Sequence, residues 1–322
     1  CTSARELQNF QARAALAAKS AQAFDDIVQS LPAGALAKTS QGKLVLLQDS
    51  FAYQAAIENR AKYTDLGLER DVLDGEAALQ REPALRSFAG RFSGGIYAKS
   101  DLALNPVVYG KALARQFVEL GATLCLGETV SGLITSGDQV TGIRTSQRSM
   151  NFDKVIMCAG NFANDLLKPL GLSVPIYPMQ GYSLTLPTTS NSPKVSITSV
   201  NDKIVFANLG TSMRIAGFMD ANQSAAGSQK RQRQLWARAQ SLWPDIAEYG
   251  GDVKYWTGQR PMTPSGVPVI GETRLKGLYL NAGHGSLGYT FAAGSAMVIA
   301  GKIGGDQYEF TSISGGQRYA VS

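Results

Sequence analysis

The sequence is poor in the residues that build metal sites and disulfides. It contains one histidine, His284, and three cysteines without a paired spacing, Cys1, Cys125 and Cys158, among 322 residues. A zinc site with several histidines is excluded, and neither a disulfide framework nor any other metal site is predicted. A Ser-His-Asp triad could form only at His284. Because Cys125 and Cys158 lie in apolar predicted strands, we expect both to be buried thiols.

A long uncharged apolar run is also lacking. The longest stretch, Leu287 to Ala300, is too short to span a bilayer, and no signal-peptide pattern is present. The first residue is Cys1 and not methionine, so we expect a fragment, a processed product or a partly determined protein. These features predict a cytoplasmic protein.

The positive charge is mild and scattered, with a net value of +6. Its densest cluster, formed by Lys230, Arg231 and Arg233, is read as a solvated helix face. The alternative is attraction to an anionic surface at the inner face of the membrane. Nucleic acid is not an expected partner, because no aromatic residues alternate with the basic ones.

Apolar periodicity predicts an α/β protein, α+β overall, with two kinds of sheet. Helices are expected at residues 4–31, 53–66, 107–120, 161–170 and 229–243. Strands are expected at residues 44–47, 94–97, 122–126 and 153–160, with a hairpin at 129–145. Further strands are expected at residues 182–186, 195–200, 203–208, 213–218 and 253–258. The strand, hairpin and strand at residues 122–160 suit the later part of a dinucleotide-binding sheet, and the short strands from residue 182 to 218 suit an antiparallel domain.

A glycine motif follows the apolar strand that begins at Leu278. Gly283-His-Gly-Ser-Leu-Gly288 matches G-x-G-x-x-G between a strand and a helix. Too little chain follows it for this to be the first turn of a Rossmann domain. It instead predicts close backbone approach to a ligand whose negative charge the helix N-terminus stabilises. Glycines that serve only tight packing are the alternative.

Arg260 is the charged residue of the second motif, Trp256-Thr-Gly-Gln-Arg-Pro-Met262. Its guanidinium offers a bidentate fork to a substrate carboxylate, and a structural ion pair is the alternative. Tyr182, Tyr255 and Tyr289 are candidates for pocket walls or hydroxyl donors, although aromatics in strands usually belong to the core. His284 either polarises a group or supports the loop.

These motifs resemble those of the D-amino-acid dehydrogenase small-subunit family, within the D-amino-acid oxidase-like flavoproteins. The resemblance rests on Tyr177-Pro-Met-Gln-Gly-Tyr-Ser-Leu-Thr-Leu-Pro187, on Trp256–Gly266 and on Asn281–Thr290, and it runs over nearly the whole chain. It implies bound FAD and hydride transfer from a D-amino acid to the flavin, which gives a 2-oxo acid and ammonia. Electrons would pass to a quinone or another acceptor.

The resemblance also implies roles for particular residues and a domain division. Arg260 would bind the substrate carboxylate, with Tyr182 and His284 as further catalytic candidates. The flavin would be bound by Val130, Ala159, Gly160, Gly258, Gly283, His284, Gly285, Ser286, Leu287, Gly288, Tyr289 and Thr290. The FAD domain would comprise residues 1–43, 98–174 and 267–322, and the substrate domain residues 44–97 and 175–266.

One departure from the family is expected to matter. The family's opening strand, G-x-G-x-x-G turn and acidic residue are absent from this sequence, which leaves the predicted Rossmann-like domain without its first βαβ unit. A missing N-terminal segment or a second polypeptide would complete the FAD site. Two other functions stay open: a related O₂-using oxidase of the glycine, sarcosine, proline or modified-tRNA-base type, and a catalytically silent subunit that has lost FAD.

Overall fold

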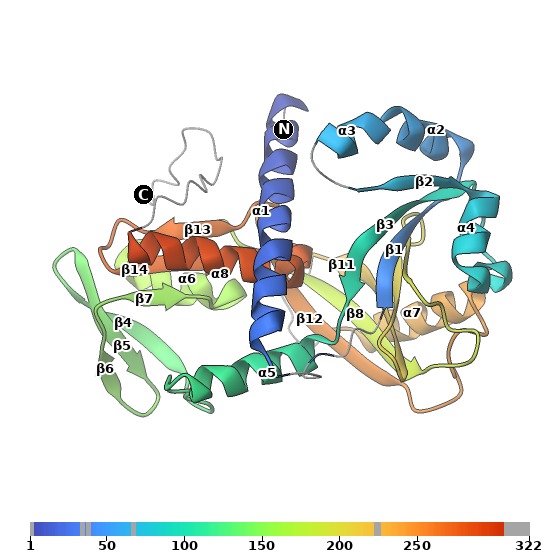
Figure 1. Cartoon of the computed structure of the whole chain (residues 1–322). Helices are drawn as coiled ribbons and strands as arrows, with labels where there is room; N and C mark the ends of the chain where they lie inside the picture. The colour runs from blue at the N-terminus through green and yellow to red at the C-terminus, as the bar shows by residue number, and fades with distance from the viewer. Residues whose placement is uncertain (1–2, 33–35, 37–39, 66–68, 222–226, 306–322) are drawn as a thin grey trace. The chain divides into compact units, whose positions relative to one another are not determined.

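The chain divides into two compact units, each built from separate stretches of sequence (Figure 1). The structure, a computed structural model, describes residues 3–32, 36, 40–65, 69–221 and 227–305. Unit 1 comprises Cys1–Pro32, Lys111–Met179 and Arg260–Ser322. Unit 2 comprises Ala33–Gly110 and Gln180–Gln259. Cys1 lies outside the described residues.

Two small sheets form the framework of unit 1. The first has the order β13-β14-β7, with β14 antiparallel to β13 and parallel to β7. Its strands are β13 (Val269–Glu272), β14 (Leu278–Ala282) and β7 (Val155–Met157). The second is antiparallel and comprises β4 (Val130–Ser136), β5 (Gln139–Thr145) and β6 (Ser149–Asn151). Because β14 and β7 are parallel, their carboxyl ends meet at one edge of the first sheet.

Two long helices cross in unit 1, α1 (Ser3–Ser30) and α8 (Gly288–Gly304) (Figure 1). At the crossing, the Gly294 N–H donates to Ser20 Oγ at 3.0 Å. Leu16, Phe291 and Val298 are buried together there with Tyr279 of β14. The remaining helical segments are α6 (Ala163–Leu167), η2 (Gly160–Phe162), η3 (Lys168–Leu170) and η4 (Gly285–Leu287), while α5 (Pro106–Glu119) spans the division between the units.

An eight-stranded sheet of order β12-β8-β11-β10-β9-β1-β3-β2 forms unit 2. Its strands are β12 (Lys254–Met262), β8 (Tyr177–Pro187), β11 (Ser212–Asp220), β10 (Ile204–Asn208), β9 (Ser196–Ser199), β1 (Ser40–Leu47), β3 (Gly94–Ala103) and β2 (Asp71–Asp74). β1 runs parallel to β9, and the other pairs of known register are antiparallel.

Three helical segments pack against one face of this sheet, namely α4 (Gly75–Arg81), η1 (Pro83–Ser87) and α7 (Gln229–Leu242). Unit 2 also contains α2 (Ser50–Glu58) and α3 (Arg60–Asp65). Trp243, at the end of α7, is fully buried and meets the rings of Phe88 and Phe206 edge-on, at 5.3 Å each. Such aromatic contacts join the helices to the strands in one core.

Most predicted helices and the hairpin are confirmed, and three predicted segments are wrong. Residues 122–126 form no strand, and the apolar side chain of Leu126 in this segment is 80% exposed. The strand expected at residues 153–160 is only Val155–Met157, and it is the outer strand of its sheet. β3 continues through Lys99 to Ala103, so the predicted end of this strand at residue 97 is wrong.

The expectation of buried thiols is also wrong. Cys125 lies in the unpaired segment at residues 122–126, and Cys158 follows the end of an outer strand. Both are free and exposed. An apolar sequence does not bury a thiol when no neighbouring strand covers it.

The basic cluster on α7 is partly neutralised. Arg231 binds Asp220 through two hydrogen bonds of 2.8 and 2.6 Å, and its guanidinium lies over the ring of Phe218. Of the three cations in this cluster, Lys230 and Arg233 are left to contribute net positive charge. This smaller charge weakens the case for a membrane-binding patch. Of the helices in the described ranges, none combines the length and apolar character needed to cross a bilayer.

Candidate functional site

A cavity of about 320 Å³ lies in unit 1, where α8 begins and where β14 and β7 end. This volume is in the lower part of the range for small-molecule pockets. Its lining residues come from four segments of unit 1 and are Cys158, Gly160, Pro261, Asn281, Ala282, Gly283, His284, Gly285, Gly288, Ala292 and Ser295.

Small residues on one face of α8 form a wall of this cavity. Gly288, Ala292 and Ser295 recur at helical spacing, so they share one face of the helix. Within the described part of the chain, no side chain caps the N-terminus of α8 or of η4. The first backbone N–H groups are therefore available to a ligand, and the helix dipole favours negative charge there.

Two glycines bring the backbone close to the cavity. Gly283 and Gly285 have φ of +82° and +58°, a conformation that other residues rarely adopt. A Cβ at Gly283 would lie 2.6 Å from Thr263 Cγ2, and one at Gly285 would lie 2.7 Å from Met262 Sδ. Both positions therefore need glycine for conformation and for space.

His284 and Asn281 carry buried polar atoms that lack partners. His284 Nε2 and Asn281 Oδ1 form no hydrogen bond to any described residue, and both side chains line the cavity. Burial lowers the pKa of His284 to about 4. The imidazole is therefore neutral at pH 7, and each group is free to bond to a ligand.

Arg260 lies directly before Pro261, which lines the cavity. It is half-buried in β12, and burial lowers the pKa of its guanidinium. A guanidinium stays charged at neutral pH even so, and an anion beside it would offset the lost hydration.

The remaining predicted flavin residues of unit 1 occupy different positions. Gly160 lines the cavity with a φ of +55°, and Ala159 precedes it at the end of β7. Val130 begins β4 and is 37% exposed. The last group, Ser286, Leu287, Tyr289 and Thr290, is exposed along η4 and the first turn of α8.

Gly258 and Tyr182 belong to unit 2. The indole of Trp256 covers Gly258, because a Cβ there would lie 2.2 Å from Trp256 Cη2. Tyr182 is 1% exposed and packs in the core. Burial raises the pKa of Tyr182, and the charge of Asp220 adds to the rise. A residue so enclosed presents no surface to a small molecule within unit 2.

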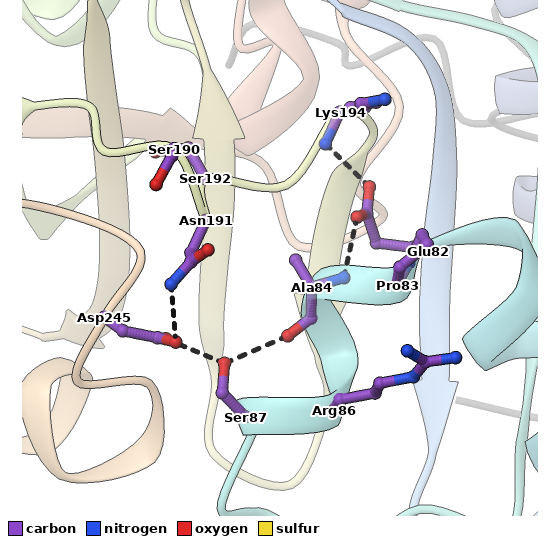
Figure 2. A pocket seen from close by; sticks show the side chains of 10 residues that line it. All are labelled: Glu82, Pro83, Ala84, Arg86, Ser87, Ser190, Asn191, Ser192, Lys194 and Asp245. Atoms are coloured by element: carbon purple, nitrogen blue, oxygen red, sulfur yellow. Dashed lines mark hydrogen bonds between the residues drawn. The ribbon is translucent and has the colours of Figure 1, made fainter.

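A second cavity, of about 310 Å³, lies in unit 2 between η1 and the segment that precedes β9 (Figure 2). Two carboxylates support it. Glu82 is 2% exposed and accepts a hydrogen bond from the backbone N–H of Lys194 at 2.6 Å. Asp245 accepts hydrogen bonds from Ser87 Oγ at 2.7 Å and from Asn191 Nδ2 at 3.2 Å. These acids hold the surrounding loops together, and none of the predicted site residues lines this cavity.

Comparison with known proteins decides the family. The profile of the family described as "FAD dependent oxidoreductase" matches residues 2–301. A D-amino acid dehydrogenase from Cereibacter sphaeroides is 33% identical over 328 residues, which cover 100% of this chain and 74% of that protein. The chain belongs to the FAD-dependent oxidoreductase family.

Other relatives in this family agree. A D-amino acid dehydrogenase from Rhizobium rhizogenes is 34% identical over 275 residues, covering 84% of this chain and 65% of that protein. The chain thus spans about two thirds of the length of such relatives. The crystal structure of glycine oxidase from Geobacillus kaustophilus matches with a TM-score of 0.81 and 22% identity, covering 92% of this chain and 80% of that one. The predicted D-amino-acid oxidase-like fold is confirmed.

The cavity suits the flavin part of the family's cofactor. Its uncapped N–H groups match the electron-rich edge of an isoalloxazine ring, and its small side chains leave room for a flat group. The partnerless Asn281 Oδ1 and His284 Nε2 call for a polar ligand. In the described residues, no group of three or more His, Cys, Asp or Glu side chains could hold a metal ion.

The sequence motifs identify only part of the cavity lining. Asn281 stands in the motif Asn281–Thr290 without a predicted role, and the predicted site residues do not include Cys158, Pro261, Ala292 and Ser295. A signal for two of them was present, since Gly288, Ala292 and Ser295 repeat at intervals of four and three residues. The other contacts depend on segments far apart in the sequence.

Proposed function

We propose that this chain provides the flavin and substrate site of an enzyme that oxidises D-amino acids to 2-oxo acids and ammonia. The cavity at the N-terminus of α8, with Arg260 immediately before a lining residue, carries the proposal. The D-amino acid dehydrogenases related at 33–34% identity support the substrate class.

Arg260 is assigned to the substrate carboxylate. Its desolvated guanidinium gains most from a ligand that brings a matching negative charge and two acceptor oxygens. Such a pair fixes the substrate's orientation, so that the Cα–H bond faces the redox partner. FAD, when bound, supplies the two-electron acceptor that takes the hydride from Cα.

The loop and helix at Gly283–Thr290 are assigned to the flavin. Backbone N–H groups of Gly285, Ser286 and Gly288 would stabilise the negative charge that grows on the ring during hydride transfer. Leu287 would contact the ring in another way, because its N–H donates to His284 O at 3.2 Å. Tyr289 and Thr290 continue this first turn. His284 is assigned as a neutral hydrogen-bonding group beside the ring, because protonation would require a pH near 4.

Three further residues are assigned to the rest of the dinucleotide. Ala159 and Gly160 follow the carboxyl end of β7, where ligands of open α/β sheets bind. Val130 offers backbone groups at the start of β4 to the adenine. Gly258 remains a prediction, and its lack of a side chain leaves room for the indole of Trp256 within unit 2.

Tyr182 remains a prediction, and we assign it an indirect role. Its ring is enclosed in the core of unit 2, and Asp220 lies beside its hydroxyl. Asp220 in turn holds Arg231. We propose that Tyr182 supports these strands and does not contact the substrate.

The partners follow from the same reaction. Electrons would pass to a quinone or another acceptor, with contact at the inner membrane face as one route. We propose that an N-terminal segment or a second polypeptide completes the pyrophosphate site, because neither the glycine loop nor the acidic residue of the family stands in this sequence.

Substitution of Arg260 tests the proposal. The protein supplied with FAD is mixed anaerobically with D-alanine, and bleaching of the flavin is followed against concentration. Arg260→Ala should weaken substrate binding by about 2–4 kcal/mol, because a desolvated charge pair is broken. Arg260→Lys should have a substrate affinity between those of the wild type and Arg260→Ala, since a lysine keeps the positive charge but lacks the bidentate geometry of the guanidinium.

Two controls sharpen this test. The exposed Arg115→Ala on α5 should leave the concentration dependence unchanged. D-alaninamide, which lacks the carboxylate, should lose little affinity in Arg260→Ala. Equal losses for D-alanine and its amide would exclude the carboxylate contact, and a flavin that no D-amino acid reduces would overturn the proposed activity. Hydrogen peroxide released in air would indicate an oxidase instead.

A further inference from the structure

Asn281 is a cavity residue whose acceptor atom has nothing to accept. It is the fourth residue of β14, and its backbone lies opposite Ile270 of β13. Its neighbours Leu280 and Ala282 are buried in one core cluster, so its side chain lies on the opposite face of the strand. There its Oδ1 is buried without a hydrogen bond to any residue that the structure describes.

A structural asparagine would be expected to have partners. Asn164 is an example in the same unit, because its amide donates to Val174 O and accepts from Val174 N, at 2.8 Å each. Buried polar atoms in folded proteins are nearly always paired, and an unpaired one costs stability. An orphan acceptor that also lines a cavity is therefore best explained by a ligand that donates a hydrogen bond.

The chemistry of the cavity narrows the choice of donor. The N-terminus of α8 supplies N–H groups, which serve the electron-rich atoms of a flavin ring. Asn281 supplies the opposite function, and it lies on β14 before the loop, where the parallel strands β14 and β7 end together. A chain of hydroxyl groups leading away from the ring would present donors at this point.

We infer that Asn281 binds the ribityl chain of the flavin, with Oδ1 accepting a hydrogen bond from a ribityl hydroxyl. The inference rests on the proposed function, since it needs a flavin in this cavity. Asn281 would bind the cofactor by accepting a hydrogen bond from it. The backbone N–H groups of the loop would instead donate hydrogen bonds to acceptor atoms of the cofactor.

Two flavins that differ only in this chain provide the test. Riboflavin carries the ribityl hydroxyls, and lumiflavin has a methyl group in their place. Binding of each to the purified protein is measured by quenching of flavin fluorescence, without any turnover. Asn281→Leu should weaken riboflavin about tenfold, the effect of losing one hydrogen bond from a buried acceptor, and lumiflavin less than about twofold.

Two other variants act as controls for binding. Asn281→Asp keeps an acceptor oxygen and should retain most of the riboflavin affinity. Asn151→Leu makes the same exchange at an exposed position of β6 and should change neither affinity.

The stability of the ligand-free protein is a second readout. Asn281→Leu removes an unpaired buried acceptor, so its melting temperature should equal or exceed that of the wild type. A purely structural asparagine would give the reverse, a clear fall in melting temperature. That fall would overturn the inference even if riboflavin binding were also weaker.

The outcomes separate the two proposals. Equal weakening of riboflavin and lumiflavin by Asn281→Leu would place the contact on the ring and overturn the ribityl assignment. Unchanged riboflavin binding would exclude Asn281 while leaving the flavin site intact. If the wild type bound neither flavin, the proposed function and this inference would both fail.

Discussion

At the scale of single residues, the site contains two polar groups that are incomplete without a ligand. His284 and Asn281 bury polar atoms that no described residue satisfies. Each arrangement costs stability in the free protein and gains from a polar partner. Sites of this kind are typical of function and not of core packing.

The histidine gives a prediction about pH. Its pKa is about 4 in the folded protein and about 6.5 in an unfolded chain. Between pH 6.5 and pH 4, His284 is protonated in the unfolded state but stays neutral in the folded state. The free energy of unfolding of the wild type should therefore fall relative to that of His284→Gln as the pH is lowered through this range. The relative loss should approach about 3 kcal/mol and level off below pH 4.

Two measurements check this prediction. Urea unfolding of both proteins between pH 7.5 and 4 gives the relative loss. Because the sequence has a single histidine, its imidazole protons can be titrated by NMR without assignment. A folded-state pKa near 6.5 would show that the ring is solvated and would contradict the burial.

At the scale of elements, the crossing of α1 and α8 depends on one glycine. A Cβ at Gly294 would lie 2.8 Å from both Cα and N of Ser20 and 2.9 Å from Leu16 O. These are backbone atoms of the other helix, which cannot rotate aside. Even a methyl group would therefore force the helices apart.

Gly294→Ala should accordingly destabilise the protein by about 1–3 kcal/mol, the usual cost of overpacking. Gly304→Ala, at the end of the same helix, is the matched control because no described atom lies within 4 Å of its added Cβ. The control should be neutral or gain up to about 1 kcal/mol from helix propensity. Thermal unfolding checks both, and equal effects would contradict the close crossing.

At the scale of the whole molecule, the chain passes between its two units several times. The first sheet of unit 1 takes β7 from the first half of the sequence, and β13 and β14 from the second. The large sheet of unit 2 pairs β1 with β9 across the same division. Neither unit is contained in one continuous half.

Fragments should therefore fail to fold alone. Residues 1–179 and residues 180–322, expressed separately, should lack a cooperative thermal transition by circular dichroism. Each half lacks strands of the β13-β14-β7 sheet and of the eight-stranded sheet, which leaves backbone groups of the remaining strands without partners. Mixing the halves after joint refolding should restore the transition to some extent. A cooperative transition in either half by itself would contradict the interleaved architecture.

Local sequence determined much of this protein. Pro106 and the apolar period that follows predicted α5, Ser136-Gly-Asp138 predicted the hairpin of β4 and β5, and the glycines at 283, 285 and 288 predicted the close approach of backbone to a cavity. These features depend on turn chemistry and periodicity, which act over a few residues. The long motifs around Arg260 and His284 also pointed to the family.

Tertiary structure alone decided which apolar segments were covered. Residues 122–126 and 153–160 look equally like buried strands, yet the first forms no strand and the second is a short outer strand. Packing also separates Tyr182 from Asn281, although both residues belong to motifs of the sequence. Tyr182 is enclosed in a core, whereas Asn281 lines a cavity. Burial and pairing depend on partners distant in sequence, and a local pattern carries no information about whether such a partner is present.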